Sequence, residues 1–101
     1  MKSRAKSAEE VRQEFLNHIH SLVSYWANLP DQTVEAKCDG LAFSILNIFD
    51  GTTIGLPAID LVLAPHPDDK SFAQSEGNNW YEPGMVINDC MLHELFIKRG
   101  V

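Results

Sequence analysis

The sequence lacks any hydrophobic run long enough to cross a membrane. A transmembrane helix needs roughly 18 or more consecutive apolar residues, and no stretch of the chain approaches that length. The basic segment at residues 1–15 also lacks the apolar region of a signal peptide. We therefore expect a cytoplasmic protein with no membrane partner.

Basic residues are scarce over most of the chain. The net charge is −6, and the segment 13–97 holds twelve acidic residues against Lys37 and Lys70. Binding to a phosphate backbone requires clustered lysine and arginine, so we expect no nucleic-acid partner. The basic residues at 1–6 are expected to form a disordered end of a single globular domain that spans residues 1–101.

Cysteines and catalytic motifs are also few. Cys38 and Cys90 are far apart in sequence and form no CxxC pair, so both are expected to be reduced and buried. The chain contains no GxSxG, GxGxxG or GxxxxGK[ST] motif. The sequence therefore assigns no catalytic residue, no metal ligand and no cofactor, and it favours a protein that is not an enzyme.

Two long helices are predicted in the first half of the chain. Residues 7–10, SAEE, form a capping-box pattern, and helically spaced apolar residues follow until Pro30 ends the helix. A second helix is expected from a cap at Asp31 or Thr33 to about residue 50, with Gly51 after it. Its second half, LAFSILNIF, is apolar nearly all round, so we expect this helix at the centre of the fold.

The second half of the chain is predicted to contain β structure and a short helix. Residues 58–64, AIDLVLA, alternate as a strand does, and residues 85–87, MVI, are a candidate second strand. A helical turn is expected at 70–74, and a last helix should follow a cap at Asn88 or Asp89. The predicted fold is α+β: a two-helix antiparallel hairpin, a small β element and a short C-terminal helix. The alternative is a mostly α fold in which 58–64 is only extended.

The segment after the predicted strand, APHPDDK, resembles a motif of the zinc-dependent N-acetylglucosaminyl deacetylases. The resemblance implies that His66 and Asp69 are metal ligands and that Asp68 is the general base for a metal-bound water. Lys70 stands where that family has a glutamate, and His93 is the one histidine available downstream as a further ligand. The other interpretation is a strand that ends in a turn, with the aspartates as turn and helix-cap residues.

A second polar segment, NNWYEPG, places Trp80 and Tyr81 in a turn-rich context. Aromatic residues with a polar group are common at interfaces and ligand sites. Trp80 either folds back over the edge of the core, or the loop 65–84 is a patch for a partner or ligand. In the second case the candidate binding residues are His66, Asp68, Asp69, Trp80 and Tyr81.

The phrases GLAFSILNIFDG, LPAIDLVLAP, NNWYE and LHELF resemble a family of small bacterial proteins with no assigned activity. The resemblance implies a small bacterial cytoplasmic protein and assigns no site residues. Two functional hypotheses follow from the sequence. The first is a non-enzymatic binding or interaction module that forms a homodimer or binds another protein. The alternative is a small metal-dependent hydrolase that uses the loop His66-Pro67-Asp68-Asp69.

Overall fold

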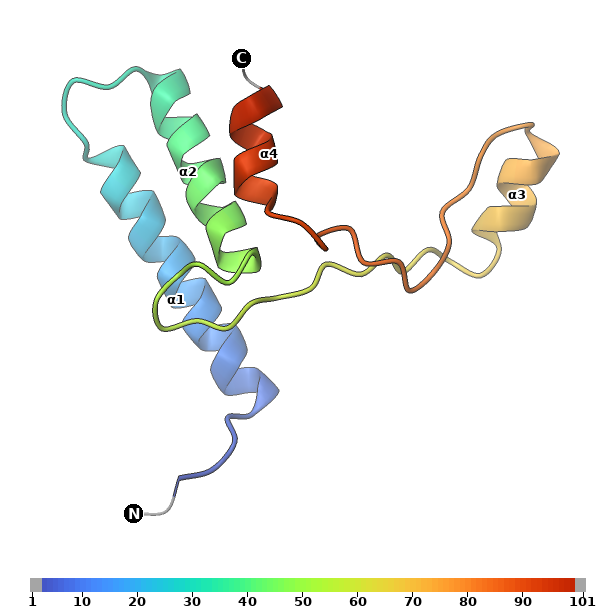
Figure 1. The fold of residues 1–101 in the computed structure, drawn as a ribbon, viewed down its shortest axis with the longest axis horizontal. Helices are drawn as coiled ribbons and strands as arrows, with labels where there is room; N and C mark the ends of the chain where they lie inside the picture. The colour runs from blue at the N-terminus through green and yellow to red at the C-terminus, as the bar shows by residue number, and fades with distance from the viewer. Residues whose placement is uncertain (1–2, 100–101) are drawn as a thin grey trace.

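Four helices form the regular structure of the chain. The computed structural model describes residues 3–99, and its helices are α1 (Ala8–Ala27), α2 (Val34–Phe49), α3 (Asp69–Ser75) and α4 (Leu92–Arg99). Figure 1 shows α1, α2 and α4 side by side, with α3 far from them at the end of a long projection. None of the helices within residues 3–99 combines the length and the apolar character that a membrane crossing requires.

The two predicted N-terminal helices are confirmed, together with their caps. The Ser7 hydroxyl accepts a hydrogen bond from the Glu10 amide, and the Glu10 carboxylate accepts one from the Ser7 amide. Thr33 caps α2 by accepting from the Ala36 amide. Gly51 follows α2 with φ of 80°, a conformation that glycine adopts without strain.

The helix α2 lies at the centre of a three-helix layer, as its apolar sequence predicts. It contacts α1 on one side and α4 on the other. Phe15 of α1 stacks on Phe49 of α2 with ring centroids 6.0 Å apart, and Trp26 lies against the middle of α2, where its indole N–H donates to Ser44. These two contacts fix α1 and α2 as an antiparallel pair. Their interlocking is close enough that a methyl group at Gly40 would collide with the Trp26 ring.

Residues 59–88 form a projection, hereafter the arm. Its two extended segments run antiparallel, with Val62 opposite Val86. The Leu63 amide donates to the Met85 carbonyl, the Gly84 amide donates to the Leu63 carbonyl, and the Ile87 amide donates to the Leu61 carbonyl. The arm ends in α3, which confirms the predicted helical turn in this part of the chain. No contact joins α3 to α1, α2 or α4 in the described residues.

The α+β prediction is wrong. About half of the described residues are helical, and they contain a single β-bridge and no sheet. Residues 58–64 and 85–87 are extended, but their pairing is short. Pro65 and Pro83 have no amide hydrogen to continue it toward the tip. At the other end the Asn88 side chain accepts from the Leu61 amide and donates to the Ile59 carbonyl. These side-chain hydrogen bonds stand in place of further backbone pairing.

The three helices make one layer with little interior. The molecule measures 51 × 47 × 20 Å, and Ile48 is its one fully buried hydrophobic residue among those described. Its radius of gyration is 17.8 Å, whereas a compact domain of this length has about 13 Å. Helices normally bury their apolar stripe against a second layer, and the described residues supply none. The fold therefore leaves much apolar surface exposed, both on the helices and on the arm.

Candidate functional site

The predicted metal-binding loop lies at the tip of the arm and forms the turn that precedes α3. The His66 amide donates to the Asp69 carboxylate at 3.0 Å, and the Asp69 amide donates to the His66 carbonyl at 3.0 Å. The Asp68 amide donates to Nδ1 of His66 at 3.1 Å. His66, Asp68 and Asp69 are all exposed, and the Asp68 side chain makes no capping bond. Their contacts are those of a turn that leads into a short helix.

The aromatic pair also lies at the arm tip, and the two rings differ in what they contact. The Lys70 ammonium of α3 sits over the Trp80 ring, 5.0 Å from the centroid. The Trp80 indole N–H donates to Glu82 at 2.7 Å. Tyr81 is 73% exposed. Trp80 therefore packs on the arm's own short helix. The loop 65–84 forms the tip of the arm and does not lie over the helical layer (Figure 1).

The hydrolase alternative needs His93 near the His66 loop, and the fold separates them. His93 lies on α4 and contacts Phe43 of α2, with ring centroids 5.5 Å apart. The loop with His66 joins α3, which Figure 1 places at the opposite end of the arm. Within residues 3–99, no three side chains of histidine, cysteine, aspartate or glutamate are grouped so that they could hold a metal ion.

The middle of the arm is a two-stranded ribbon with apolar side chains on both faces. Leu61 and Leu63 pair with Ile87 and Met85, so these four share one face, while Val62 and Val86 share the other. Val62 is 53% exposed, Met85 is 52% exposed and Ile87 is 47% exposed. Isolated two-stranded ribbons are marginal in water. Apolar residues on both faces are typical of strands that are covered on both sides.

Hydrogen bonds at the base of the arm fix its direction. The Asn88 side chain donates to the Ile59 carbonyl at 2.7 Å and accepts from the Leu61 amide at 2.8 Å, which locks the two segments together. The Ile59 amide donates to the carbonyl of Phe49, the last residue of α2. The arm is thus tied directly to the end of the central helix. With these bonds in place, the arm runs away from the helical layer (Figure 1).

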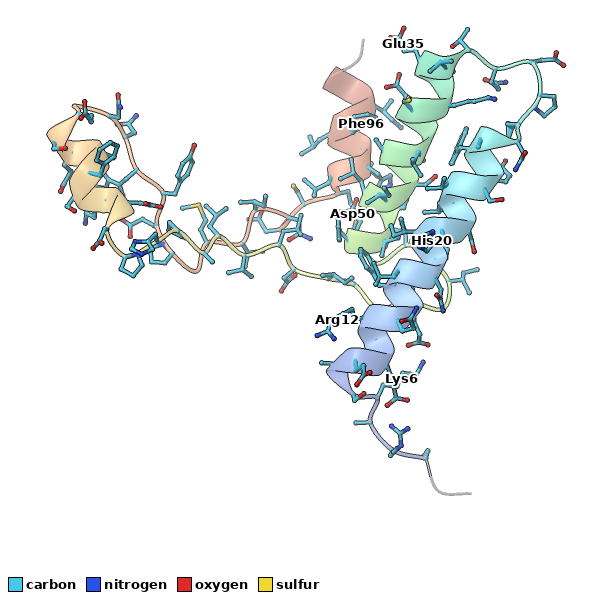
Figure 2. All side chains as sticks on the ribbon, turned by 180° about the vertical axis from the view of Figure 1, so that it is seen from behind. Lys6, Arg12, His20, Glu35, Asp50 and Phe96 are labelled. Atoms are coloured by element: carbon cyan, nitrogen blue, oxygen red, sulfur yellow. The ribbon has the colours of Figure 1, made fainter. Side chains whose placement is uncertain are left out.

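A second tie joins α2 to α4 through a buried carboxylate. Asp50 follows α2, and its carboxylate accepts from the Leu92 amide at 3.0 Å and the His93 amide at 2.8 Å. A 2.5 Å hydrogen bond also joins it to Nδ1 of His93. Figure 2 shows Asp50 where α2 ends beside α4. Burial alone would raise the pKa of Asp50, but the hydrogen bonds from His93 and Leu92 outweigh burial and lower it.

This tie corrects the predicted start of the last helix. Asn88 and Asp89 do not cap it, because Asn88 is used at the base of the arm and α4 begins at Leu92. The free amides of its first turn are satisfied by Asp50, which is distant in sequence. Gly100, which was expected to close this helix, lies outside the described residues.

A shallow pocket of about 300 Å³ opens at the base of the arm. Its walls come from the end of α2, the start of the arm and the segment before α4, and the lining residues are Phe49, Asp50, Ala58, Asp60, Asn88, Asp89, Cys90 and Met91. The Asp50 carboxylate in this wall is already saturated by α4. Cys90 and Cys38 are both free thiols and are exposed, so the expectation that they are buried is wrong.

The structure brings the five predicted binding residues together at the arm tip, and the larger apolar surface of the arm was missed. His66, Asp68, Asp69, Trp80 and Tyr81 all belong to the arm tip. The apolar surface of Leu61, Leu63, Met85 and Ile87 was not predicted as a site. The sequence contained an indication of this surface in two apolar runs, IDLVLA and MVI. Nearly continuous apolar runs are typical of strands that are buried on both faces. Asp50 gave no signal, because its partners lie 42 and 43 residues away.

The arm, rather than a catalytic cluster, is the main candidate site of this chain. Comparisons with protein-family models, with curated proteins and with solved structures find no match.

Proposed function

We propose that this chain is a non-enzymatic interaction module that works as a homodimer. The observation that carries the proposal is the exposed apolar surface of the arm, which projects from the helical layer on a hydrogen-bonded base. Contiguous exposed apolar surface marks interaction sites in soluble proteins. The same chain exposes apolar residues on its helices as well, namely Leu16, Val23, Leu95 and Ile97.

The amount of exposed surface supports a second copy as the partner. The accessible surface is 8041 Å² for a chain of 11.3 kDa, whereas a compact monomer of that mass exposes about 5,700 Å². The excess is roughly 2,300 Å² per chain. If each copy buried half of this excess, the interface would total roughly 2,300 Å², which lies in the range of obligate dimers.

Light scattering coupled to size-exclusion chromatography tests the proposal. At tens of micromolar the expected mass is twice the chain mass of 11.3 kDa. Met85→Asp should shift the protein toward the monomer, because it places a charge on the exposed apolar face of the arm. Ile54→Asp is the matched control: Ile54 is 99% exposed and lies in the loop between α2 and the arm, outside both apolar surfaces. A monomeric mass for the unaltered chain would end the proposal.

Metal analysis separates this proposal from the hydrolase alternative. A hydrolase built on the His66 loop requires metal bound in stoichiometric amount and a thermal shift when zinc is added to stripped protein. The interaction module requires neither. We expect zinc to leave the unfolding temperature unchanged, and a shift that disappears in His66→Ala would favour the hydrolase.

A further inference from the structure

We propose that the dimer forms by reciprocal arm exchange: the arm of each copy packs on the layer of α1, α2 and α4 in the other copy. This inference rests on the proposed function, because it states how the two copies of that dimer contact each other. Residues 59–88 of a second chain then cover the exposed helical layer. A two-fold axis makes the contact mutual, so each copy gives one arm and receives one.

The first argument is that both unpartnered surfaces belong to the same chain. The arm has the apolar face Leu61, Leu63, Met85 and Ile87, and no element within residues 3–99 covers it. The whole molecule is only 20 Å across its shortest axis, and no second layer in the described residues covers the helices. Arm exchange covers the arm and the layer together, in equal number, without a third component.

The second argument is that the arm is held away from its own layer. The base is fixed by the bonds from Asn88 to Ile59 and Leu61, and by the bond from Ile59 to Phe49. Asp50 fixes the other side of the base by holding the first turn of α4. With all of these bonds in place the arm runs away from α1, α2 and α4 (Figure 1), so its apolar face is open to a second copy.

The third argument is electrostatic and disfavours contact between the two arms. The arm, residues 59–88, carries five acidic residues against Lys70 alone, a net charge of −4. The layer carries less negative charge per residue. Six acidic residues lie at 8–49 and one at 92–97, against Arg12 and Lys37, which is a net charge of −5 over 48 residues compared with −4 over 30 in the arm. Packing two arms on each other would bring the denser negative charges together.

Paramagnetic broadening between copies tests the arrangement directly. All samples carry Cys38→Ser and Cys90→Ser, which together remove both native thiols. Light scattering first establishes whether this double variant, the background sequence, is still a dimer. A nitroxide is attached to Gln74→Cys, an exposed position on α3. This spin-labelled chain, without isotope, is unfolded, mixed with ¹⁵N-labelled chain of the background sequence, and refolded. We expect loss of amide peak intensity in α1, α2 or α4 of the ¹⁵N-labelled copy.

The outcomes separate this inference from the proposed function. A dimer in which broadening is confined to the arm of the ¹⁵N copy, or is absent, overturns arm exchange and leaves the dimer standing. A monomeric mass overturns both. A third sample carries nitroxide and ¹⁵N in one chain, diluted into excess unlabelled chain. Broadening of that chain's own layer would show that the arm folds back and would overturn the inference, whereas an unaffected layer supports it.

Discussion

The carboxylate of Asp50 and the imidazole of His93 are joined by a 2.5 Å hydrogen bond between residues 43 positions apart. The side chain of Asp50 is fully buried and that of His93 is 15% exposed. Asp50 also accepts from the Leu92 and His93 amides. Asp50 is thus the residue at the end of α2, and its carboxylate binds the first turn of α4 beside the base of the arm (Figure 2).

Removing this carboxylate should destabilise the fold. Asp50→Ala leaves two amides and one ring nitrogen without their acceptor, so we expect a loss of about 2–3 kcal/mol in the free energy of unfolding. Urea denaturation followed by circular dichroism measures it. Asp60→Ala is the control, since Asp60 lies on the same pocket but is exposed, and its effect should stay within about 0.5 kcal/mol. Equal effects of the two substitutions would contradict the role given to Asp50.

The same carboxylate predicts part of the acid sensitivity. The pKa of Asp50 is lowered in the folded state, because the hydrogen bonds to the carboxylate outweigh its burial. A lowered folded pKa means that the stabilisation is complete above the unfolded value of about 3.9 and is lost as the pH falls through the folded value. The stability of Asp50→Asn should therefore fall less steeply than that of the unaltered chain below about pH 4. Urea midpoints at a series of pH values check this, and parallel curves would count against it.

The contact between Trp26 and Gly40 predicts that alanine is harmful in the middle of α2. Alanine favours a helix over glycine by about 1 kcal/mol, but the added methyl group would collide with the Trp26 ring. That ring cannot move freely, because its N–H is bonded to Ser44. We expect Gly40→Ala to cost about 1–3 kcal/mol through overpacking. Asp39→Ala, at an exposed neighbouring position, should be neutral or stabilising, and a stabilised Gly40→Ala variant would show that the two helices pack more loosely.

An ion pair at the start of α1 should be visible in a titration. The pKa of Glu10 is lowered to about 2, first by the Arg4 guanidinium and then by hydrogen bonds from Ser7. Arg4 forms two bonds to this carboxylate, of 2.7 and 3.0 Å. Arg4→Ala should raise the pKa of Glu10 clearly, as followed by carboxyl-carbon chemical shifts. Lys6→Ala should raise it much less, because Lys6 has the smallest effect and pairs instead with Glu14. A larger shift with Lys6→Ala would reverse this order.

Dimer formation predicts that thermal stability depends on protein concentration. When folding is coupled to association, dilution favours the unfolded monomer and lowers the unfolding temperature. We expect a progressive fall in Tm across a hundredfold dilution for the unaltered chain. The Met85→Asp variant should show a Tm that is lower and nearly independent of concentration. A Tm that stays constant in the unaltered chain would contradict coupled folding and dimerisation.

The first half of the fold could be predicted from sequence because its signals are local. The capping box at Ser7, the Thr33 cap and the glycine after α2 act through neighbours within a few residues. The apolar character of residues 41–49 also predicted a central place for α2, with α1 beside it. The proposed homodimer has no such local signal, and it stays a prediction.

The second half could not be predicted in the same way, because its outcome depends on partners that are distant in sequence. The strand pattern of residues 58–64 correctly indicated extended backbone. Whether that backbone enters a sheet depends on where Pro83 and Asn88 fall in the facing segment, and they limit the pairing to a short ribbon. Asp68 and Asp69 as turn and helix-cap residues was one of two open interpretations; the contacts at the arm tip match the turn, but the Asp68 side chain makes no capping bond.

The sequence by itself determined the two long helices, the central place of α2 and the position of the short helix at 69–75, because helix periodicity and capping are short-range effects. Only the tertiary structure decided that α4 begins where the Asp50 carboxylate accepts from the Leu92 and His93 amides. It also decided that residues 59–88 project from the helical layer as an arm. Both depend on hydrogen bonds between residues 27 to 43 positions apart. Such bonds require residues that are distant in sequence to lie side by side in the fold, and no local pattern in the sequence marks them.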